Sequence, residues 1–352
     1  KSLLAGRIPV EKAFLRPAAA YAEQQIDLRT GVRVEHLSRP QQSLTLSDGS
    51  RATYDTLVLA CGGRPRLLTL DTVIPVHYLR NLRDTLALRD KLRPGVRVVI
   101  IGAGFVGLEV AATARDMQCE VVVIEAADYV LSRVAPREIG AFFENLHRQH
   151  GVQFKMSTRV NRIKECGEAA CVETSHGESI PADVVLAGIG IVPNTELASG
   201  AGLAVDDGIL TDEFGRTSDP SIYAIGDVAQ HFNPIVGRHA RLECWQNAQD
   251  QARAIANIIA GGSEPYATVP WLWTDQYELV FRSAGSFNVR DDVVCRGSPH
   301  QAKWTVFYLR EGKVAGGATL SNPRDLRLIR KLVASNHTVH PEVLRDPNIE
   351  LR

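Results

Sequence analysis

A glycine-rich turn between two apolar segments constrains this chain more than any other feature. Residues 96–101 (VRVVII) form a nearly continuous apolar run, which is typical of a parallel strand buried on both faces. The turn at 102–107 (GAGFVG) follows at once and opens an alanine-rich helix expected over 106–117. A second apolar strand at 120–124 ends in Glu125, about 20 residues beyond the first glycine. This order of strand, turn, helix, strand and acid predicts a dinucleotide site at the edge of a parallel sheet.

The glycines and the acid of this motif have separate tasks in binding a dinucleotide. The first glycine permits a tight turn, the second lets the backbone approach a pyrophosphate, and the third allows the helix to pack closely on the strand. The amides at the start of the helix then bind phosphate. Glu125 can accept hydrogen bonds from a ribose 2′-hydroxyl and repels a 2′-phosphate, which predicts NADH rather than NADPH. The expected NADH-binding residues are Gly102, Gly104, Phe105, Val106, Gly107, Glu109, Glu125, Arg133 and Gly190.

Two charged residues near the turn have more than one interpretation. Arg133 is assigned to the pyrophosphate or the adenosine of NAD, and a solvated loop arginine is an equally good interpretation. Glu109 lies in the first turns of the helix, where a carboxylate complements the helix dipole. In a flavoenzyme the same carboxylate could also reach the carboxamide of nicotinamide.

The composition of the chain sets broad limits on its function. A length of 352 residues with 45% hydrophobic residues suits two or three domains. The 40 basic and 40 acidic residues balance, so no net charge favours nucleic acid or an anionic membrane surface. No apolar run is long enough for a helix to span a bilayer, which needs about 20 residues. We therefore expect a cytoplasmic protein that binds neither nucleic acid nor membrane.

Two further strand ends indicate a second ligand site. The strand expected at 54–60 is stopped by Cys61-Gly62-Gly63, and the strand expected at 221–225 runs into Gly226-Asp227. The second of these puts an amide and a carboxylate together at the C-terminal end of a strand, where open α/β sheets bind ligands. As a lone dipeptide it would more often be a simple turn.

Together these segments resemble the two-dinucleotide flavoproteins, and among them the ferredoxin reductases that serve oxygenases. The resemblance covers nearly the whole chain and is carried by 54–66 (YDTLVLACGGRPR), 107–109 (GLE), 226–227 (GD), 245–248 (WQNA) and 271–277 (WLWTDQY). It implies an α/β fold with two Rossmann-like domains of the glutathione-reductase type and a C-terminal α+β domain. The implied boundaries are an FAD domain at 1–76 and 197–268, an NADH domain at 77–196 and a C-terminal domain at 269–352.

The resemblance also implies the residues that hold FAD. Asp227 would bind the ribityl chain, the amide of Gly226 the phosphates, and Lys1 would lie near the flavin. Trp271 and Trp273 would lie near the flavin edge and the ferredoxin surface, and for Trp273 an ordinary core aromatic is as good an interpretation. The implied FAD-binding residues are Lys1, Ala60, Cys61, Gly62, Arg64, Gly226, Asp227, Trp245 and Trp271.

The sequence departs from the family pattern in two places. Cys61 stands where the family usually has threonine, and a thiol is the weaker hydrogen-bond donor. The family begins with its own strand, GxGxxG turn and helix for the ADP half of FAD, and this sequence contains no such unit before residue 54. We therefore expect that the N-terminal βαβ unit is missing from the sequence.

The implied activity is that of an NADH:ferredoxin oxidoreductase. NADH would give hydride to FAD, and electrons would pass singly to a [2Fe–2S] ferredoxin that feeds an oxygenase or a cytochrome P450. The flavin carries this chemistry, so no catalytic histidine is expected, and only Lys1 and Glu109 are placed near the reacting rings. We expect a monomer or a weak dimer.

A basic helix offers one docking surface for such a partner. Arg324, Arg327, Arg330 and Lys331 recur at helical spacing, and many ferredoxins are acidic. A solvated basic face is the favoured interpretation of this pattern.

Other classes of protein remain open alternatives. One is an apoptosis-inducing-factor-like protein that acts through partners, another is a rubredoxin or other NADH-dependent flavoprotein reductase, and a third is an NAD dehydrogenase without flavin. A disulfide reductase would need a redox-active cysteine pair. The six cysteines form no C-x-x-C motif, so we expect free thiols. Cys166 and Cys171 flank Gly167 in an expected hairpin, and we do not expect them to form a redox centre.

Overall fold

The fold is that of a computed structural model, which describes residues 1–70, 72, 74–167, 169–300, 304–320, 322–349 and 351. The chain divides into two compact units. The first unit comprises Lys1–Ala13, Pro65–Ile191 and Trp273–Arg352, and the second comprises Phe14–Arg64 and Val192–Leu272. The division into three domains stays a prediction, and residues 1–13 and 65–76 of the expected FAD domain lie in the first unit.

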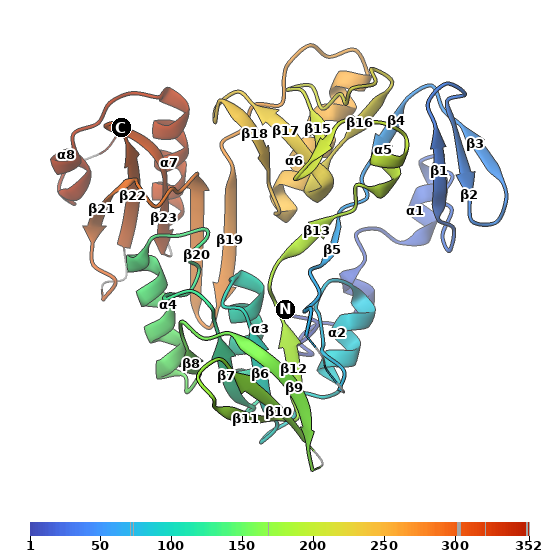
Figure 1. The fold of residues 1–352 in the computed structure, drawn as a ribbon. Helices are drawn as coiled ribbons and strands as arrows, with labels where there is room; N and C mark the ends of the chain where they lie inside the picture. Colours follow the sequence, from blue (N-terminus) through green and yellow to red (C-terminus); the bar gives the residue numbers. More distant parts are fainter. Residues whose placement is uncertain are drawn as a thin grey trace. The chain divides into compact units, whose positions relative to one another are not determined.

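The first unit contains a four-stranded parallel sheet (Figure 1). Its order is β12 (Val184–Ala187), β6 (Arg97–Ile101), β7 (Glu120–Ile124) and β8 (Gln153–Lys155). Helix α3 (Phe105–Asp116) joins β6 to β7, and α4 (Arg137–Gln149) joins β7 to β8. Almost every residue of β6 and β12 is buried, because a parallel sheet covered on both faces needs apolar side chains on both. The predicted parallel sheet and its glycine-rich turn are confirmed.

A three-stranded antiparallel sheet lies beside this parallel sheet in the first unit. It consists of β11 (Ser179–Ala182), β10 (Ala169–Thr174) and β9 (Val160–Cys166). One of its faces packs Ile163, Ala170 and Val172 against the parallel sheet. The short helix α2 (Leu82–Arg89) and the 3-10 helix η1 (Val10–Ala13) complete this part of the unit, and α2 begins with a capping box of Asn81 and Asp84.

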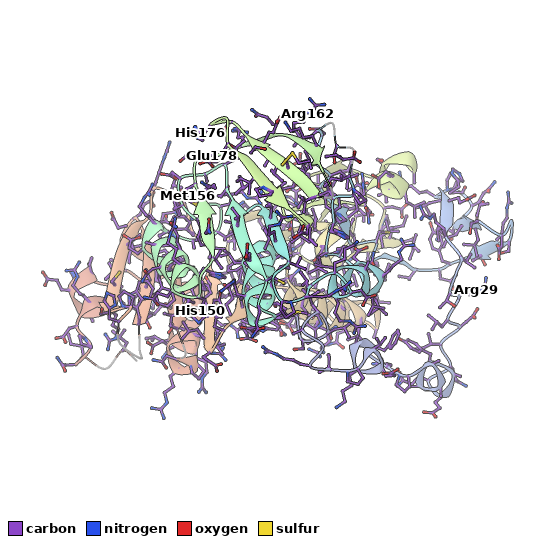
Figure 2. The ribbon with its side chains drawn as sticks, turned by 90° about the horizontal axis from the view of Figure 1, so that it is seen from below. Arg29, His150, Met156, Arg162, His176 and Glu178 are labelled. Carbon is purple, nitrogen blue, oxygen red and sulfur yellow. A yellow bond between two sulfur atoms is a disulfide. The ribbon has the colours of Figure 1, made fainter. Side chains whose placement is uncertain are left out.

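The prediction that all six cysteines are free is wrong for one pair. Cys166 and Cys171 form a disulfide across the β9–β10 hairpin, with their Cα atoms 5.6 Å apart. Figure 2 shows this bond, drawn in yellow, on the same sheet as Arg162. In the strand register Cys166 faces Ala169 and Cys171 faces Lys164, so the two cysteines are diagonal neighbours on one face. The other four cysteines are free.

The C-terminal part of the first unit is the α+β fold that the sequence predicts. Its sheet has the order β19 (Trp271–Gln276), β20 (Leu279–Gly285), β23 (Lys313–Leu320), β22 (Trp304–Arg310) and β21 (Asp292–Gly297). Helix α7 (Pro323–Ser335) packs on β23 and β20, and α8 (Pro341–Arg345) packs on β21. The approach of α7 is close, because a Cβ at Gly317 would lie 3.2 Å from the Ile329 side chain.

The second unit contains three small groups of strands. An antiparallel sheet of β1 (Val34–Ser38), β2 (Ser43–Leu46) and β3 (Arg51–Thr53) leads to β4 (Leu57–Leu59), which pairs in parallel with β16 (Ile222–Ala224). A further sheet has the order β14 (Val205–Asp206), β15 (Gly208–Thr211), β17 (Ala229–Asn233) and β18 (Arg238–Arg241). The helices are α1 (Ala18–Glu23), α5 (Glu196–Gly200), the 3-10 helix η2 (Gly226–Val228) and α6 (Trp245–Ile259). The chain passes from one unit to the other at four places: after Ala13, within β5 (Gly63–Pro65), within β13 (Ile191–Pro193) and after Leu272 in β19.

None of the helices in the described part of the chain combines the length and the apolar composition that crossing a lipid bilayer would require.

The disulfide can be tested by counting thiols. Unfolded without reductant, the protein should present four reactive thiols to a thiol reagent, and after reduction all six. The variant Cys171→Ser should add the Cys166 thiol to the four and then give the same count with and without reductant. The loop between the two cysteines is short, so breaking the bond should cost roughly 2 kcal/mol of hairpin stability. Six reactive thiols before reduction would contradict the bond.

Candidate functional site

The three glycines of the turn between β6 and α3 differ in what a side chain would contact at each position. Gly102 has φ +102°, and a Cβ there would lie 2.5 Å from the carbonyl oxygen of Gly188. A Cβ at Gly107 would lie 2.1 Å from the carbonyl oxygen of Gly102, so the missing side chain is what lets α3 approach β6. A Cβ at Gly104 would meet no atom within 4 Å. The first and third glycines therefore close the turn, and the second borders open space.

The start of α3 offers unpaired amides beside this open space. Gly104 is the N-cap residue in extended conformation, and no side chain caps the helix. The first amides of a helix have no partner within the helix, and together with the helix dipole they favour an anion. Val106, in the first turn, is 48% exposed. The arrangement suits a phosphate group at the glycine turn.

Glu125 is held at the turn by two backbone amides. Its Oε2 accepts a hydrogen bond from the amide of Ala103 at 2.7 Å, and its Oε1 accepts one from the amide of Ala127 at 2.8 Å. A carboxylate oxygen can accept more than one hydrogen bond, so both oxygens retain capacity for hydroxyl donors. The predicted acid is thus fixed beside the open space of Gly104.

Arg133 and Gly190 lie together near the same sheet edge. Gly190 has φ +100°, and a Cβ there would lie 3.5 Å from Nη2 of Arg133. In the part of the chain that the structure describes, Arg133 forms no ion pair with a carboxylate. Its guanidinium is therefore a cation available to a phosphate, and its role in binding NAD stays a prediction.

Glu109 has one hydrogen bond from a residue distant in sequence. The hydroxyl of Thr274, in β19, donates to Oε1 of Glu109 at 2.5 Å. Glu109 therefore has a fixed partner on the C-terminal sheet besides its place near the N-terminus of α3. The sequence pattern does not single out Thr274, although it belongs to the segment 271–277 that carries the resemblance.

The two strand ends expected to bind FAD share one sheet edge in the second unit. In the parallel pair, Ala224 of β16 faces Leu59 of β4, so the residues after both strands emerge side by side. Gly62 has φ +59° and Gly226 has φ +72°, a region that glycine adopts readily. Ala60, Cys61, Gly62, Arg64, Gly226 and Asp227 are thus brought together by the fold.

Asn194 braces the first of these strand ends and was missed from the sequence. Its side-chain Nδ2 donates to the carbonyl of Cys61 at 2.9 Å, and its amide donates to the carbonyl of Gly62 at 2.9 Å. Arg64 donates in turn to Oδ1 of Asn194 at 2.8 Å. No motif marks this asparagine, because it lies far from residue 62 in sequence.

The expected role of the Gly226 amide needs correction. That amide donates to Oε1 of Gln251 at 2.8 Å, so in this structure it is directed into the protein and not toward a phosphate. Gln251 is fully buried on α6, on the same face as Asn247 and Ile255. In the sequence, polar residues on an otherwise apolar face of this helix could have indicated that Gln251 bonds to a buried group. Gly226 is also close to α6, since a Cβ there would lie 3.6 Å from the Cβ of Ala248.

The remaining predicted FAD residues are divided between the units. Trp245 begins α6 and is 57% exposed. Trp271 begins β19 in the second unit, where its carbonyl accepts from Sγ of Cys244, the N-cap residue of α6, at 3.4 Å. Lys1 and Trp273 belong to the first unit, and the structure does not test their expected place near the flavin.

Comparisons with known proteins agree on one family. Residues 1–252 match the family described as pyridine nucleotide-disulphide oxidoreductase, and residues 271–352 match the reductase C-terminal family. The ferredoxin–NAD(+) reductase component of the anthranilate 1,2-dioxygenase system of Burkholderia cepacia is 42% identical over 97% of this chain and 85% of its own length. Putidaredoxin reductase of Pseudomonas putida is 39% identical over 100% of this chain and 85% of its own length. The crystal structure of the covalent putidaredoxin reductase–putidaredoxin complex has a TM-score of 0.95 at 39% identity, covering 100% of this chain and 86% of that chain.

The chain belongs to the pyridine nucleotide-disulphide oxidoreductase family. The predicted fold class and the resemblance to oxygenase-coupled ferredoxin reductases are confirmed. The FAD and NAD(H) cofactors of this family agree with what the residues can hold. The open space at Gly104 and the uncapped start of α3 suit the pyrophosphate of NAD(H), and the paired ends of β4 and β16 suit FAD.

Two alanine substitutions can separate the tasks of the turn glycines in this oxidoreductase. Gly107→Ala must displace the Gly102 carbonyl, which should cost up to about 3 kcal/mol of stability. Gly104→Ala meets open space at φ −77°, so it should cost about 1 kcal/mol or less while its methyl group obstructs the pyrophosphate. Denaturant unfolding and NAD⁺ titration measure the two effects. Equal NAD⁺ affinity in Gly104→Ala and the unaltered protein would contradict the assignment of the open space.

Proposed function

We propose that this chain is an NADH:ferredoxin oxidoreductase, which passes electrons from NADH through FAD to a [2Fe–2S] ferredoxin that serves an oxygenase or a cytochrome P450. One observation carries the proposal: the chain is similar over at least 97% of its length to a ferredoxin–NAD(+) reductase component and to putidaredoxin reductase. One of its structural relatives is putidaredoxin reductase in a covalent complex with putidaredoxin. The oligomeric state, monomer or weak dimer, stays a prediction.

Residues of the first unit would account for a preference for NADH over NADPH. The start of α3 would bind the pyrophosphate, and Arg133 would add a cation to it. Glu125 would accept hydrogen bonds from the ribose hydroxyls of the adenosine. A 2′-phosphate would bring a second anion against a carboxylate that two backbone amides hold in place, so NADPH would bind more weakly.

The residues of the second unit would hold the flavin. Asp227 would bind the ribityl chain, and the loop after β4, braced by Asn194, would lie along the dinucleotide. When bound, FAD supplies the step that no side chain here can perform, which is to accept two electrons as hydride and release them one at a time. The protein therefore needs to orient the two dinucleotides and exclude water.

Two observations bear on the alternatives. The glycine-containing ends of β4 and β16, in a chain of this family, argue against an NAD dehydrogenase without flavin. Cys166 and Cys171 do form a disulfide, but they lie on a β-hairpin, whereas the redox pairs of flavin disulfide reductases lie on a helix beside the flavin. We therefore do not propose disulfide reduction.

The test is a comparison of electron donors with a [2Fe–2S] ferredoxin as acceptor. The protein carrying FAD should be bleached by NADH without oxygen, and it should then reduce ferredoxin at a rate that is much higher with NADH than with NADPH. A yellow protein that NADH bleaches but that does not reduce any [2Fe–2S] ferredoxin would favour the apoptosis-inducing-factor-like alternative.

The variant Glu125→Arg supplies the matched control within this test. It replaces the carboxylate by a guanidinium that can pair with a 2′-phosphate, so the ratio of kcat/KM for NADH over NADPH should fall at least tenfold. The rate of ferredoxin reduction after the flavin is reduced should stay the same. An unchanged NADH/NADPH ratio would reject the role of Glu125.

The basic face of α7, for which a solvated face is the favoured interpretation, can also be tested as the surface that meets the ferredoxin. Arg324, Arg327 and Lys331 are exposed on this helix, and acidic partners associate faster with such a face. Arg327→Glu with Lys331→Glu should slow ferredoxin reduction several-fold at low salt, and less at high salt, while reduction of a small dye is unchanged. The exposed Arg83→Glu on α2 is the matched charge reversal. Equal slowing by Arg83→Glu, or none by the α7 pair, would show that α7 is not the dock.

A further inference from the structure

A continuous chain of side-chain hydrogen bonds ends on Glu109 in the first unit. The hydroxyl of Tyr277 lies 3.2 Å from Nδ1 of His147, and Nε2 of His147 lies 2.7 Å from Oε1 of Gln276. Nε2 of Gln276 donates to Oγ1 of Thr274 at 3.2 Å, and Thr274 donates to Oε1 of Glu109 at 2.5 Å. Glu109 lies in α3, His147 in α4, and Thr274 and Gln276 in β19, while Tyr277 lies in the turn that follows β19.

The donor and acceptor atoms of these side chains allow the hydrogen bonds to be donated in only one direction along the series. Oε1 of Gln276 can only accept, so the proton of His147 must lie on Nε2, and Nδ1 must then accept from Tyr277. The amide nitrogen of Gln276 can only donate, so Oγ1 of Thr274 accepts from it and its own proton points to Glu109. Every donated proton therefore points toward the Glu109 carboxylate, which is an acceptor only.

Because these side chains are buried, any other pattern of hydrogen bonds among them would be unfavourable. His147 and Gln276 are 0% exposed and Thr274 is 2% exposed. Burial lowers the pKa of His147 to about 4, so its ring is neutral at neutral pH and carries a single proton. Burial also raises the pKa of Tyr277, so its hydroxyl keeps its proton. Each broken link would leave a buried polar group without a partner, at a cost larger than the bond itself would contribute.

Tyr277, at the opposite end of the hydrogen-bond series from Glu109, has an unusual backbone conformation. Tyr277 has φ +52° at the turn from β19 to β20, a region that aromatic residues seldom adopt. Its ring stacks on His150 with centroids 3.6 Å apart and meets the edge of the His147 ring at 5.1 Å. The surrounding packing thus determines this conformation and directs the hydroxyl to His147.

We propose that Thr274, Gln276 and His147 are positioning residues that hold the Glu109 carboxylate in one rotamer for the carboxamide of nicotinamide. The inference rests on the proposed NADH site and concerns its nicotinamide end. Thr274 occupies one carboxylate oxygen, and in the described part of the chain no residue donates a hydrogen bond to the other, Oε2. An amide NH₂ group is a suitable donor for that oxygen, whereas the carboxylate of a nicotinic acid analogue would be repelled.

The test compares two ligands that differ in the nicotinamide. NAD⁺ and ADP-ribose share the adenosine and the pyrophosphate, and neither transfers hydride to the flavin. In Thr274→Val, which removes only the hydroxyl, the Kd for NAD⁺ should rise about tenfold and the Kd for ADP-ribose should stay within about twofold. Thr274→Ser, which keeps the hydroxyl, should restore NAD⁺ affinity. An equal change for both ligands, or no change for either, would overturn the proposal.

Thr319→Val is the matched control for a merely structural effect. Thr319 is 1% exposed in β23, and its hydroxyl bonds to Thr305 and to the Trp304 carbonyl, outside the chain that ends on Glu109. It should lose a similar amount of stability and keep the Kd for NAD⁺. If the unaltered protein binds neither NAD⁺ nor ADP-ribose, the proposed function itself fails, which is a different result from equal effects on both ligands.

The direction of hydrogen-bond donation can be measured in the unaltered protein from the protonation of His147. Nitrogen NMR of labelled histidine should show His147 as a neutral ring with the proton on Nε2. His147→Gln, whose amide can occupy the position of Nε2, assigns the signal by its loss. A proton on Nδ1, or a charged ring at neutral pH, would overturn the proposal even if Thr274→Val does not fold.

Discussion

The close contact of α3 with β6 is the constraint on which the first unit depends. A single added carbon at Gly107 would lie 2.1 Å from the carbonyl of Gly102, so the helix can approach only because that carbon is missing. The same approach directs the uncapped amides of α3 toward the open space at Gly104. It also brings the amide of Ala103 within 2.7 Å of the Glu125 carboxylate. Packing of helix on strand and recognition of a dinucleotide therefore have one geometric origin.

The second unit builds its strand-end site by a different means. At Gly226 an added Cβ would meet only the Cβ of Ala248 at 3.6 Å, and side chains from distant elements hold the strand ends. Asn194 holds the carbonyls of Cys61 and Gly62, and Gln251 takes the amide of Gly226. These bonds satisfy backbone groups that a turn would otherwise leave without partners. The strand ends proposed to hold FAD therefore present side chains and positive-φ glycines, and the Gly226 amide is turned inward.

Prediction from the sequence succeeded where the signal was local and failed where it was not. The strand, glycine turn and helix at 96–117 are specified by neighbours in sequence, and the observed α3 begins only one residue earlier than expected. The Cys166–Cys171 bond depends on strand register, which places the two cysteines diagonally across the hairpin. The contacts of Gly226 with Gln251 and of Thr274 with Glu109 span 25 and 165 residues. Nothing in the local pattern around either partner indicates such a contact.

The hydrogen bonds from Tyr277 to Glu109 do not clearly offset the free energy that is lost when their polar groups are buried. Net hydrogen bonds contribute about 1 kcal/mol each, while apolar side chains of similar size in the same space would stabilise the core without any need for partners. A set of hydrogen-bonded polar side chains is therefore not the most stable filling of the buried space between α3, α4 and β19. What it supplies is a defined state for the group at its end: one rotamer, one acceptor oxygen occupied and one left for a ligand. Glu109 therefore differs from an acid that merely complements the dipole of α3, because dipole complementation requires no fixed rotamer and no series of buried donors.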